Sequence, residues 1–244
     1  MPPPRKRADV LLVERGLFES RARAQAAIEA GLVTANARQV LKASENIPAD
    51  AELQAQPAHP FVSRGGVKLS GALERYPFEI EDHVCLDVGA STGGFTEVLL
   101  AGGASLVFSI DVGRSQLHPS LRGHPKIVSM EETDIRSFEG KRLPQRPDIV
   151  VIDVSFISLK AVLPMALSLA AAPMHLLALI KPQFEAARKH SRRGIIRDAE
   201  VHRQVCDDIA AFATSLGCSN IEVFPSPIAG GDGNLEFFIG ARRG

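Results

Sequence analysis

The sequence predicts an α/β protein in which a mostly parallel sheet is covered by helices, preceded by a small α+β unit. From residue 83 onward, continuous apolar runs alternate with helical patterns, which is typical of a parallel sheet buried on both faces. A short glycine-rich turn joins the last two apolar runs, so the last strand is expected to be antiparallel. The 244 residues suffice for one domain of ordinary size and one small domain.

Residues 8–56 form the predicted small domain. Ser20 is a good N-cap for the helical pattern that follows it, and Gly31 is placed to end that helix. Two short strand patterns, 32–35 and 38–41, come next and are joined by an Asn-Ala turn. This order indicates helices packed on a small hairpin.

Residues 57–61 are a predicted linker that contains two prolines, and residues 62–244 are the predicted larger domain. Its expected helices cover 95–103, 158–171 and 199–215. Its expected strands cover 83–88, 106–111, 126–130, 148–153, 175–181, 221–227 and 235–241.

Composition excludes several classes of protein. The net charge is zero, so any basic surface for nucleic acid must be local. The three cysteines form no CxxC pair and the histidines show no ligand spacing, so we expect a reducing cytoplasm and no metal site. Residues 161–180 are uncharged over a membrane-spanning length, but Pro173 divides them, which favours a helix followed by a buried strand.

A glycine-rich loop follows the first strand of the larger domain and opens a helix. Gly89, Gly93 and Gly94 would let the backbone approach a ligand, but the spacing matches neither a dinucleotide fingerprint nor a P-loop. Asp87 precedes this loop, and Asp111 ends the next strand, where acidic residues hold ribose hydroxyls. The pattern indicates an adenosyl ligand without pyrophosphate; the alternative is a tight turn needed only for packing.

Ionisable residues lie at the predicted carboxyl edge of the sheet, where open α/β sheets bind ligands. Asp153 and Lys181 end two strands, Glu236 starts the antiparallel one, and Lys68 precedes the sheet. They form either a catalytic cluster or two structural ion pairs.

The segment from Lys181 to residue 203 is rich in basic residues and has no apolar periodicity. It is either a loop that grips RNA phosphates or a solvated loop, and its position after Lys181 favours RNA. The predicted RNA contacts in it are Arg188, Lys189, Arg192 and Arg193. Phe156 and Phe184 flank the strand ends and belong either to a base-stacking surface or to the core.

The small domain resembles the RNA-binding domain first described in ribosomal protein S-four. The resemblance rests on the run DVLLVERGLFESRARAQAAIEAGLV and on the following N-x-x-x-V-x-K, with Ala37 where that family usually has a turn glycine. It implies that Arg21, Arg23 and Lys42 contact RNA phosphates, which position RNA and specify little sequence.

The chain as a whole resembles the TlyA (haemolysin A) family over about residues 8–242. The segments that carry the resemblance are FVSRGGVKLSGAL, LDVGASTGGFTEVLL, SIDVGRSQLHPSLR, VIDVSFISL, LIKPQFE, GIIRDAEVH and SPIAGGDGNLEFF. It implies a Rossmann-like, FtsJ-like methyltransferase domain that transfers a methyl group from S-adenosylmethionine to the 2′-hydroxyl of cytidine in ribosomal RNA.

The resemblance also implies roles for single residues. The catalytic tetrad falls on Lys68, Asp153, Lys181 and Glu236, with Lys181 as the base or as the cation that orients the oxygen. The cofactor residues fall on Asp87, Gly89, Ala90, Ser91, Thr92, Gly93, Gly94, Asp111 and Asp134. Asp134 stands where the family usually has asparagine, and an aspartate can accept a hydrogen bond from adenine but cannot donate one.

Two other functions are weighed against the methyltransferase. A membrane-active haemolysin needs a signal, a span or a strongly cationic amphipathic helix, and the sequence shows no such pattern. A non-catalytic ribosome-assembly factor would be expected to lose the tetrad or the glycine loop, and both are complete. We therefore expect a cytoplasmic, monomeric enzyme whose partner is ribosomal RNA or a ribosomal subunit.

Overall fold

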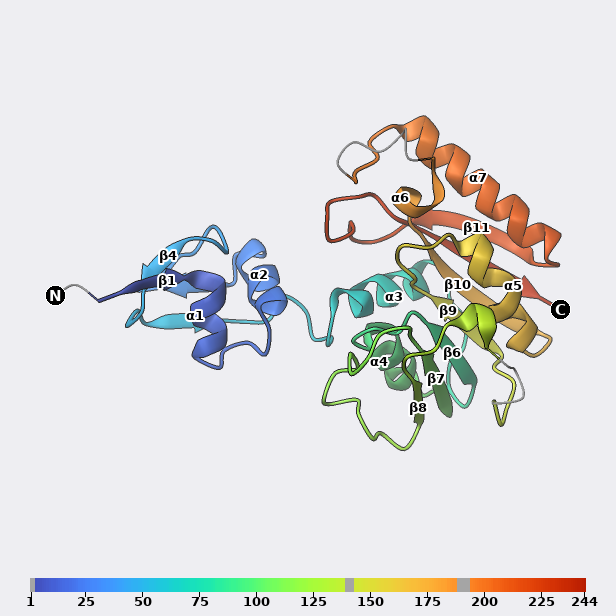
Figure 1. Ribbon diagram of the computed structural model, residues 1–244, viewed down its shortest axis with the longest axis horizontal. Coiled ribbons are helices and arrows are strands. Elements are labelled where there is room, and N and C mark those ends of the chain that lie inside the picture. Colours follow the sequence, from blue (N-terminus) through green and yellow to red (C-terminus); the bar gives the residue numbers. More distant parts are fainter. Residues whose placement is uncertain (1–2, 139–142, 188–193) are drawn as a thin grey trace. The chain divides into compact units, whose positions relative to one another are not determined.

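The computed structural model describes residues 3–138, 143–187 and 194–244 and divides into two compact units, Met1–Pro60 and Phe61–Gly244 (Figure 1). The four basic residues predicted to contact RNA near the catalytic edge lie outside the described residues, namely Arg188, Lys189, Arg192 and Arg193.

The first unit packs two helices on short strands. Its elements are β1 (Arg5–Arg7), α1 (Ala8–Glu14), α2 (Arg21–Glu29), β2 (Val33–Ala35), β3 (Arg38–Gln39), β4 (Asn46–Pro48) and β5 (Leu53–Ala55). β1 pairs with β4, and β2 lies between β3 and β5. The core contains Leu11, Leu12, Ile28 and Ile47, each at most 3% exposed.

Local sequence signals in this unit act as predicted. The Ser20 hydroxyl accepts a hydrogen bond from the Arg23 amide at 3.3 Å and caps α2. Asn36 and Ala37 have φ of 50° and 61°, so the β2–β3 hairpin turns through two left-handed residues, as the twist of paired strands favours.

The second unit is built on a seven-stranded sheet in the order β11-β12-β10-β9-β6-β7-β8. All neighbouring pairs are parallel except those of β12, which is antiparallel to both β10 and β11, as the sequence predicted for the last strand. The strands are β6 (Val84–Val88), β7 (Leu106–Ile110), β8 (Ile127–Met130), β9 (Ile149–Ile152), β10 (Met174–Ile180), β11 (Ser219–Pro225) and β12 (Phe237–Arg243).

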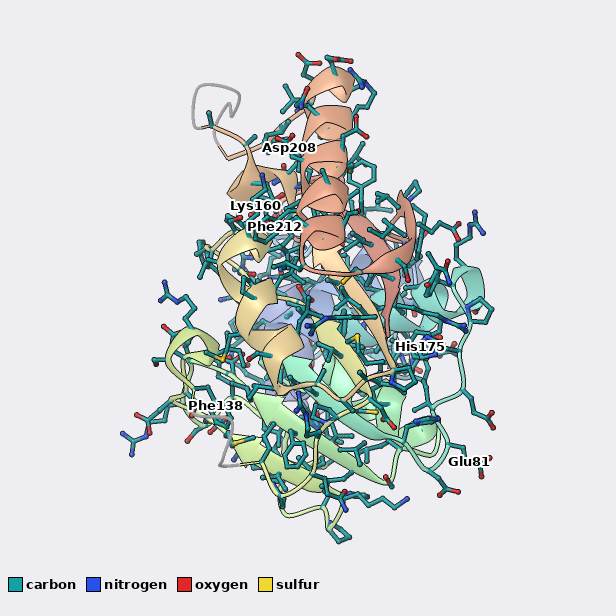
Figure 2. All side chains as sticks on the ribbon, turned by 90° about the vertical axis from the view of Figure 1, so that its right-hand side faces the viewer. Glu81, Phe138, Lys160, His175, Asp208 and Phe212 are labelled. Carbon is teal, nitrogen blue, oxygen red and sulfur yellow. The ribbon has the colours of Figure 1, made fainter. Side chains whose placement is uncertain are left out.

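Helices cover both faces of this sheet and create two separate cores. α3 (Arg64–Arg75) and α4 (Gly94–Ala101) pack on one face around residues such as Leu69 and Phe95. α5 (Leu159–Leu169), α7 (Ala199–Ser215) and the 3-10 helix η1 (Ile135–Ser137) pack on the other face around Leu163 and Ile209. Figure 2 views the unit from the side of α5 and α7, with Phe212 of α7 labelled beside α5. Both faces are therefore buried, which explains the continuous apolar strands.

The structure contains elements that the sequence did not predict, and it resolves one ambiguity. The helix α3, which carries Lys68, and the single turn α6 (Pro182–Glu185) were not predicted, and neither were the short elements β1, β4, β5 and η1. The uncharged stretch 161–180 is a helix followed by a buried strand, as predicted. In the described part of the chain, no helix combines the length and apolar character needed to cross a membrane.

Candidate active site

The carboxyl edge of the sheet gathers ionisable residues from three adjacent strands. Asp153 follows β9, Lys181 follows β10, and Glu236 precedes the antiparallel β12. Ile180 and Phe237 are register partners, so the residues beside them leave the sheet at the same edge. Neighbouring strands are about 5 Å apart, which puts the backbones of Lys181 and Glu236 within reach of a common ligand.

Two buried ion pairs form at this edge. Lys181 Nζ lies 2.6 Å from Asp153 Oδ1 and donates to Ser155 Oγ at 2.8 Å. Lys68 Nζ, which projects from α3, donates to Glu236 Oε2 at 2.6 Å. Both lysines are 8% exposed and Glu236 is 5% exposed. Burying four such charges is costly unless each is paired, and the pairing found here meets that condition.

Lys181 retains capacity for a further partner. An ammonium group has three N–H donors; one of them goes to Ser155, while Asp153 lies in ion-pair contact and its Oδ1 accepts no hydrogen bond from a described residue. Among the described residues, no other protein acceptor binds this ammonium group. Asp153 and Ser155 also line the adjoining cavity, so the ammonium group, which does not line it, is held directly behind two residues that a ligand can reach.

The glycine loop after β6 owes its shape to close backbone contacts. Gly89 has φ of +85°, and a β-carbon there would lie 2.5 Å from the carbonyl oxygen of Asp153. Gly93 has φ of +89° and packs against the side chains of Leu117 and Leu121. Only glycine adopts these conformations without strain, so the loop lies directly against the segment that carries Asp153.

A cavity of about 530 Å³ runs along the carboxyl ends of β6, β7 and β9. Four predicted cofactor residues line it, namely Gly89, Ser91, Asp111 and Asp134, together with Asp153 and Ser155 of the ionisable edge. The other predicted cofactor residues do not line it: Asp87, Ala90, Thr92, Gly93 and Gly94. These residues shape the loop and the first turn of α4 instead.

Asp111 holds two loops of the cavity wall together. Its Oδ2 accepts a hydrogen bond from the Ser91 amide at 2.8 Å, and its Oδ1 accepts one from the Gly113 amide at 2.7 Å. The glycine loop is thereby tied to the segment after β7.

Asp87 is fully buried behind the glycine loop. Its Oδ2 accepts a hydrogen bond from Thr96 Oγ1 at 2.7 Å, and Thr96 Oγ1 lies 2.8 Å from Ser109 Oγ. Its Oδ1 has no hydrogen-bond partner among the described residues. Burial raises the pKa of Asp87 to about 7, because the charged form loses water that one hydroxyl does not replace.

Asp134 lies in the cavity wall but is already bound by a neighbour. It caps η1 through the Arg136 amide, and the Arg136 guanidinium contacts both of its carboxylate oxygens. These hydrogen bonds lower the pKa of Asp134, so the carboxylate is charged and its partner cation also lines the cavity. The negative charge of Asp134 is therefore balanced by Arg136.

The sequence analysis missed three residues that the structure brings to the edge: Ser155, Arg136 and Glu185. Each stands within four residues of a predicted residue, so proximity along the chain is the signal that could have found them. Phe156 was left open between core and surface, and it is 90% exposed with its ring centroid 5.0 Å from that of Phe184.

The predicted RNA contacts of the first unit have different surroundings. Arg21 pairs with the fully buried Asp9 at 2.7 Å, and Arg7 and Gln25 bind the same carboxylate. The hydrogen bond from Arg7 is the main reason why the pKa of Asp9 lies well below its usual range. The predicted contact Arg23 is half-buried on α2, and the other one, Lys42, is exposed.

Comparison with known proteins identifies the methyltransferase class. Residues 61–243 match the model of the FtsJ-like methyltransferases, and this match covers most of the chain. The chain belongs to the FtsJ-like methyltransferase family. Within the described residues, no group of three or more His, Cys, Asp or Glu side chains could hold a metal ion.

Three relatives of this FtsJ-like protein span nearly its whole length. YqxC of Bacillus subtilis, which carries the name of an rRNA methyltransferase, is 42% identical over 96% of this chain and 85% of its own length. The 16S/23S rRNA (cytidine-2′-O)-methyltransferase TlyA of Mycobacterium tuberculosis is 39% identical over 98% of this chain and 90% of its own. A solved structure titled as a haemolysin of Streptococcus thermophilus is 40% identical, covers 98% and 89% of the two chains, and has a TM-score of 0.79.

Proposed function

We propose that this FtsJ-like enzyme transfers a methyl group from S-adenosylmethionine to the 2′-hydroxyl of a cytidine in ribosomal RNA. The observation that carries the proposal is the Lys181 ammonium, held by an ion pair with Asp153 and a hydrogen bond to Ser155, two residues that line the cavity. The rRNA (cytidine-2′-O)-methyltransferase TlyA of Mycobacterium tuberculosis, a full-length relative, supports this choice of substrate.

The residues around the cavity suit S-adenosylmethionine. Asp111 lines the cavity and can accept from ribose hydroxyls, while Asp87, which does not line it, would support the glycine loop from behind through Thr96. The apolar walls, which include Ile110, Val112 and Ile135, suit an adenine ring. When bound, S-adenosylmethionine supplies an electrophilic methyl group on a sulfonium centre.

The protein's own residues orient the nucleophile. An N–H of Lys181 that Ser155 does not take would donate to the ribose 2′-oxygen and fix one of its lone pairs, leaving the other directed at the methyl group. Asp153 would hold Lys181 close to the cavity, and it would be the nearest carboxylate to accept the hydroxyl proton. The ion pair between Lys68 and Glu236 would give the site a second fixed cation and a second fixed anion beside Lys181, so that the electrostatic field at the nucleophile does not change during the reaction.

RNA would also be bound by residues that lie outside the catalytic site. The first unit would bind RNA phosphates through Arg21, Arg23 and Lys42, and Arg188, Lys189, Arg192 and Arg193 would add further phosphate contacts. The exposed ring of Phe156 is suited to stack on a base of the substrate. One chain carries all of these groups, so we propose that the enzyme acts as a monomer.

The test is transfer of labelled methyl from S-adenosylmethionine to separated ribosomal subunits from a strain that lacks the enzyme. Wild type should label one cytidine ribose or a few, located by mass spectrometry of nuclease digests. Lys181→Ala should lower kcat by about 10²–10⁴-fold, the range expected for losing a group that handles a proton or orients an oxygen. A matched control is Lys126→Ala, which removes a lysine that donates to the Ala104 carbonyl oxygen.

The outcomes separate the candidate functions. Label that is lost in Lys181→Ala but kept in Lys126→Ala supports the proposal. Wild-type turnover in Lys181→Ala would overturn the assignment of Lys181. If no subunit is labelled although calorimetry shows cofactor binding, the chain is an RNA-binding assembly factor or acts on another RNA.

A further inference from the structure

Two loops at the catalytic edge run side by side and contact each other at three successive points. The loop 153–159 leads from β9 into α5, and residues 181–185 lead from β10 through α6. Lys181 contacts Asp153 and Ser155 at one end of this pair of loops. The rings of Phe184 and Phe156 meet in the middle, with centroids 5.0 Å apart.

Glu185 makes the third contact and closes the pair of loops. Its Oε2 accepts a hydrogen bond from the Ser158 hydroxyl at 2.5 Å, and its Oε1 accepts one from the Leu159 amide at 2.7 Å. Ser158 is also the N-cap of α5, because its hydroxyl accepts from the Lys160 amide at 3.1 Å. The start of α5 is therefore capped by its own serine and by a carboxylate from the segment after Lys181.

The loop that Glu185 holds carries an unusual conformation. Phe156 has φ of +65°, a left-handed backbone conformation that is strained for a bulky side chain. Its ring is also 90% exposed, so burial of the ring in the core does not stabilise this geometry. Such strain persists only where surrounding contacts hold the loop, and those contacts come from Phe184 and Glu185.

Glu185 itself has no place in the chemistry proposed above. It does not line the cavity beside Lys181, and its partners are a hydroxyl and an amide of the α5 start. Glu185 is half-buried, and burial raises its pKa. A carboxylate in this position therefore loses hydration energy, which its two hydrogen bonds must offset.

We propose that Glu185 is a positioning residue that locks the loop 153–159, keeping Ser155 against Lys181 and Phe156 presented to the RNA. This inference rests on the proposed function, because it assigns the locked loop to the substrate side of that site. Removing the carboxylate would free the start of α5, and the strained Phe156 would relax to an ordinary conformation. The RNA contact would weaken first, while the cofactor cavity would keep its remaining walls.

The experiment compares Glu185→Ala and Glu185→Gln with wild type in the full chain. The glutamine can still accept from the Leu159 amide and pair with the Ser158 hydroxyl, so it should stay within about threefold of wild type. Glu185→Ala should raise KM for the RNA substrate about tenfold, with a smaller fall in kcat and an unchanged Kd for S-adenosylmethionine. The neighbouring cavity of about 320 Å³ between α6 and α7 admits water into the space left, which favours folding of the variant.

Limited proteolysis measures how often the loop 153–159 opens, and it does not depend on methyltransferase activity. Chymotrypsin should cleave after Phe156 faster in Glu185→Ala than in wild type, because cleavage requires the loop to open. The matched control is Glu81→Ala, an exposed carboxylate that Figure 2 shows far from Lys160 at the start of α5. Its KM and its cleavage rate should equal those of wild type.

The outcomes distinguish this inference from the proposed function. Unchanged cleavage after Phe156 together with an unchanged KM in Glu185→Ala would overturn the inference while leaving the methyltransferase intact. An inactive wild type would overturn the proposed function instead, and the proteolysis would still report on the lock. If Glu185→Ala does not fold, Glu185→Leu, which fills the same space but removes both hydrogen bonds, should show the same KM and cleavage changes.

Discussion

Replacing Asp87 by asparagine should stabilise the methyltransferase unit at neutral and alkaline pH. The carboxylate is fully buried, one hydroxyl binds it, and its Oδ1 has no partner among the described residues. Burial raises its pKa from an ordinary 3.8 to about 7, so the folded state takes up a proton that the unfolded chain has already lost. Asparagine keeps an acceptor for the Thr96 hydroxyl and carries no charge at any pH.

The sign and the size of the effect follow from this shift. Between pH 3.8 and about 7, folded wild type binds more protons at Asp87 than the unfolded state does, so its free energy of unfolding falls as pH rises. Above pH 7 the cost is complete. A rise of about three pKa units corresponds to about 4 kcal/mol, which is an upper figure because water entry and relaxation reduce it. We expect Asp87→Asn to gain about 2–4 kcal/mol over wild type at pH 8 and almost nothing at pH 4.

The chain offers a specific probe for this measurement. It has no tryptophan and one tyrosine, Tyr76, which belongs to the second unit. Urea unfolding followed by tyrosine fluorescence, without cofactor, therefore reports on that unit alone across pH 4–8. Parallel stability curves for the two proteins would refute the reasoning.

Three further predictions concern other parts of the molecule. Lys68→Met should destabilise the second unit by about 3–5 kcal/mol in urea unfolding, because it leaves Glu236 buried without a partner. Adding Glu236→Leu should restore the stability but not the activity. Equal stability of the single and double variants would contradict this prediction. Gly89→Ala should abolish cofactor binding in calorimetry, because its β-carbon meets a carbonyl oxygen and its φ is +85°, and retained affinity would show that the loop can move. Arg21→Ala should lower the stability of the first unit by about 1–3 kcal/mol, measured by far-UV circular dichroism, because the buried Asp9 loses one of its partners. An unchanged transition would mean that Arg7 and Gln25 satisfy that carboxylate without Arg21.

The lysine–carboxylate pairs decide how mutations at this site should be interpreted. Each tetrad residue is both a proposed participant in methyl transfer and half of a buried ion pair. Loss of activity in a single substitution therefore mixes chemistry with stability, unless unfolding is measured beside kcat. Comparing Lys68→Met with the double variant that adds Glu236→Leu separates these two effects, because the double variant should be stable and inactive.

Much of the fold could be predicted because its signals are local. The helix pattern 199–215 coincides with α7, and Asp198 caps it through the Glu200 amide as a helix start requires. The strands of the second unit fall within two residues of their predicted bounds, since strands buried on both faces read as continuous apolar runs. The helix α3 was missed because glycines weaken its helical signal, and its stability comes from packing on α4.

The sequence by itself determined the order of the elements, the glycine loop and the residue types at the carboxyl edge of the sheet. Only the tertiary structure decided which of these residues pair. Lys68 meets Glu236 across 168 positions of sequence, and Glu185 caps a helix that begins 26 residues before it. The physical reason is range: periodicity and capping act within a turn or two of the chain, whereas ion pairs between elements depend on strand order and on how helices pack across the sheet.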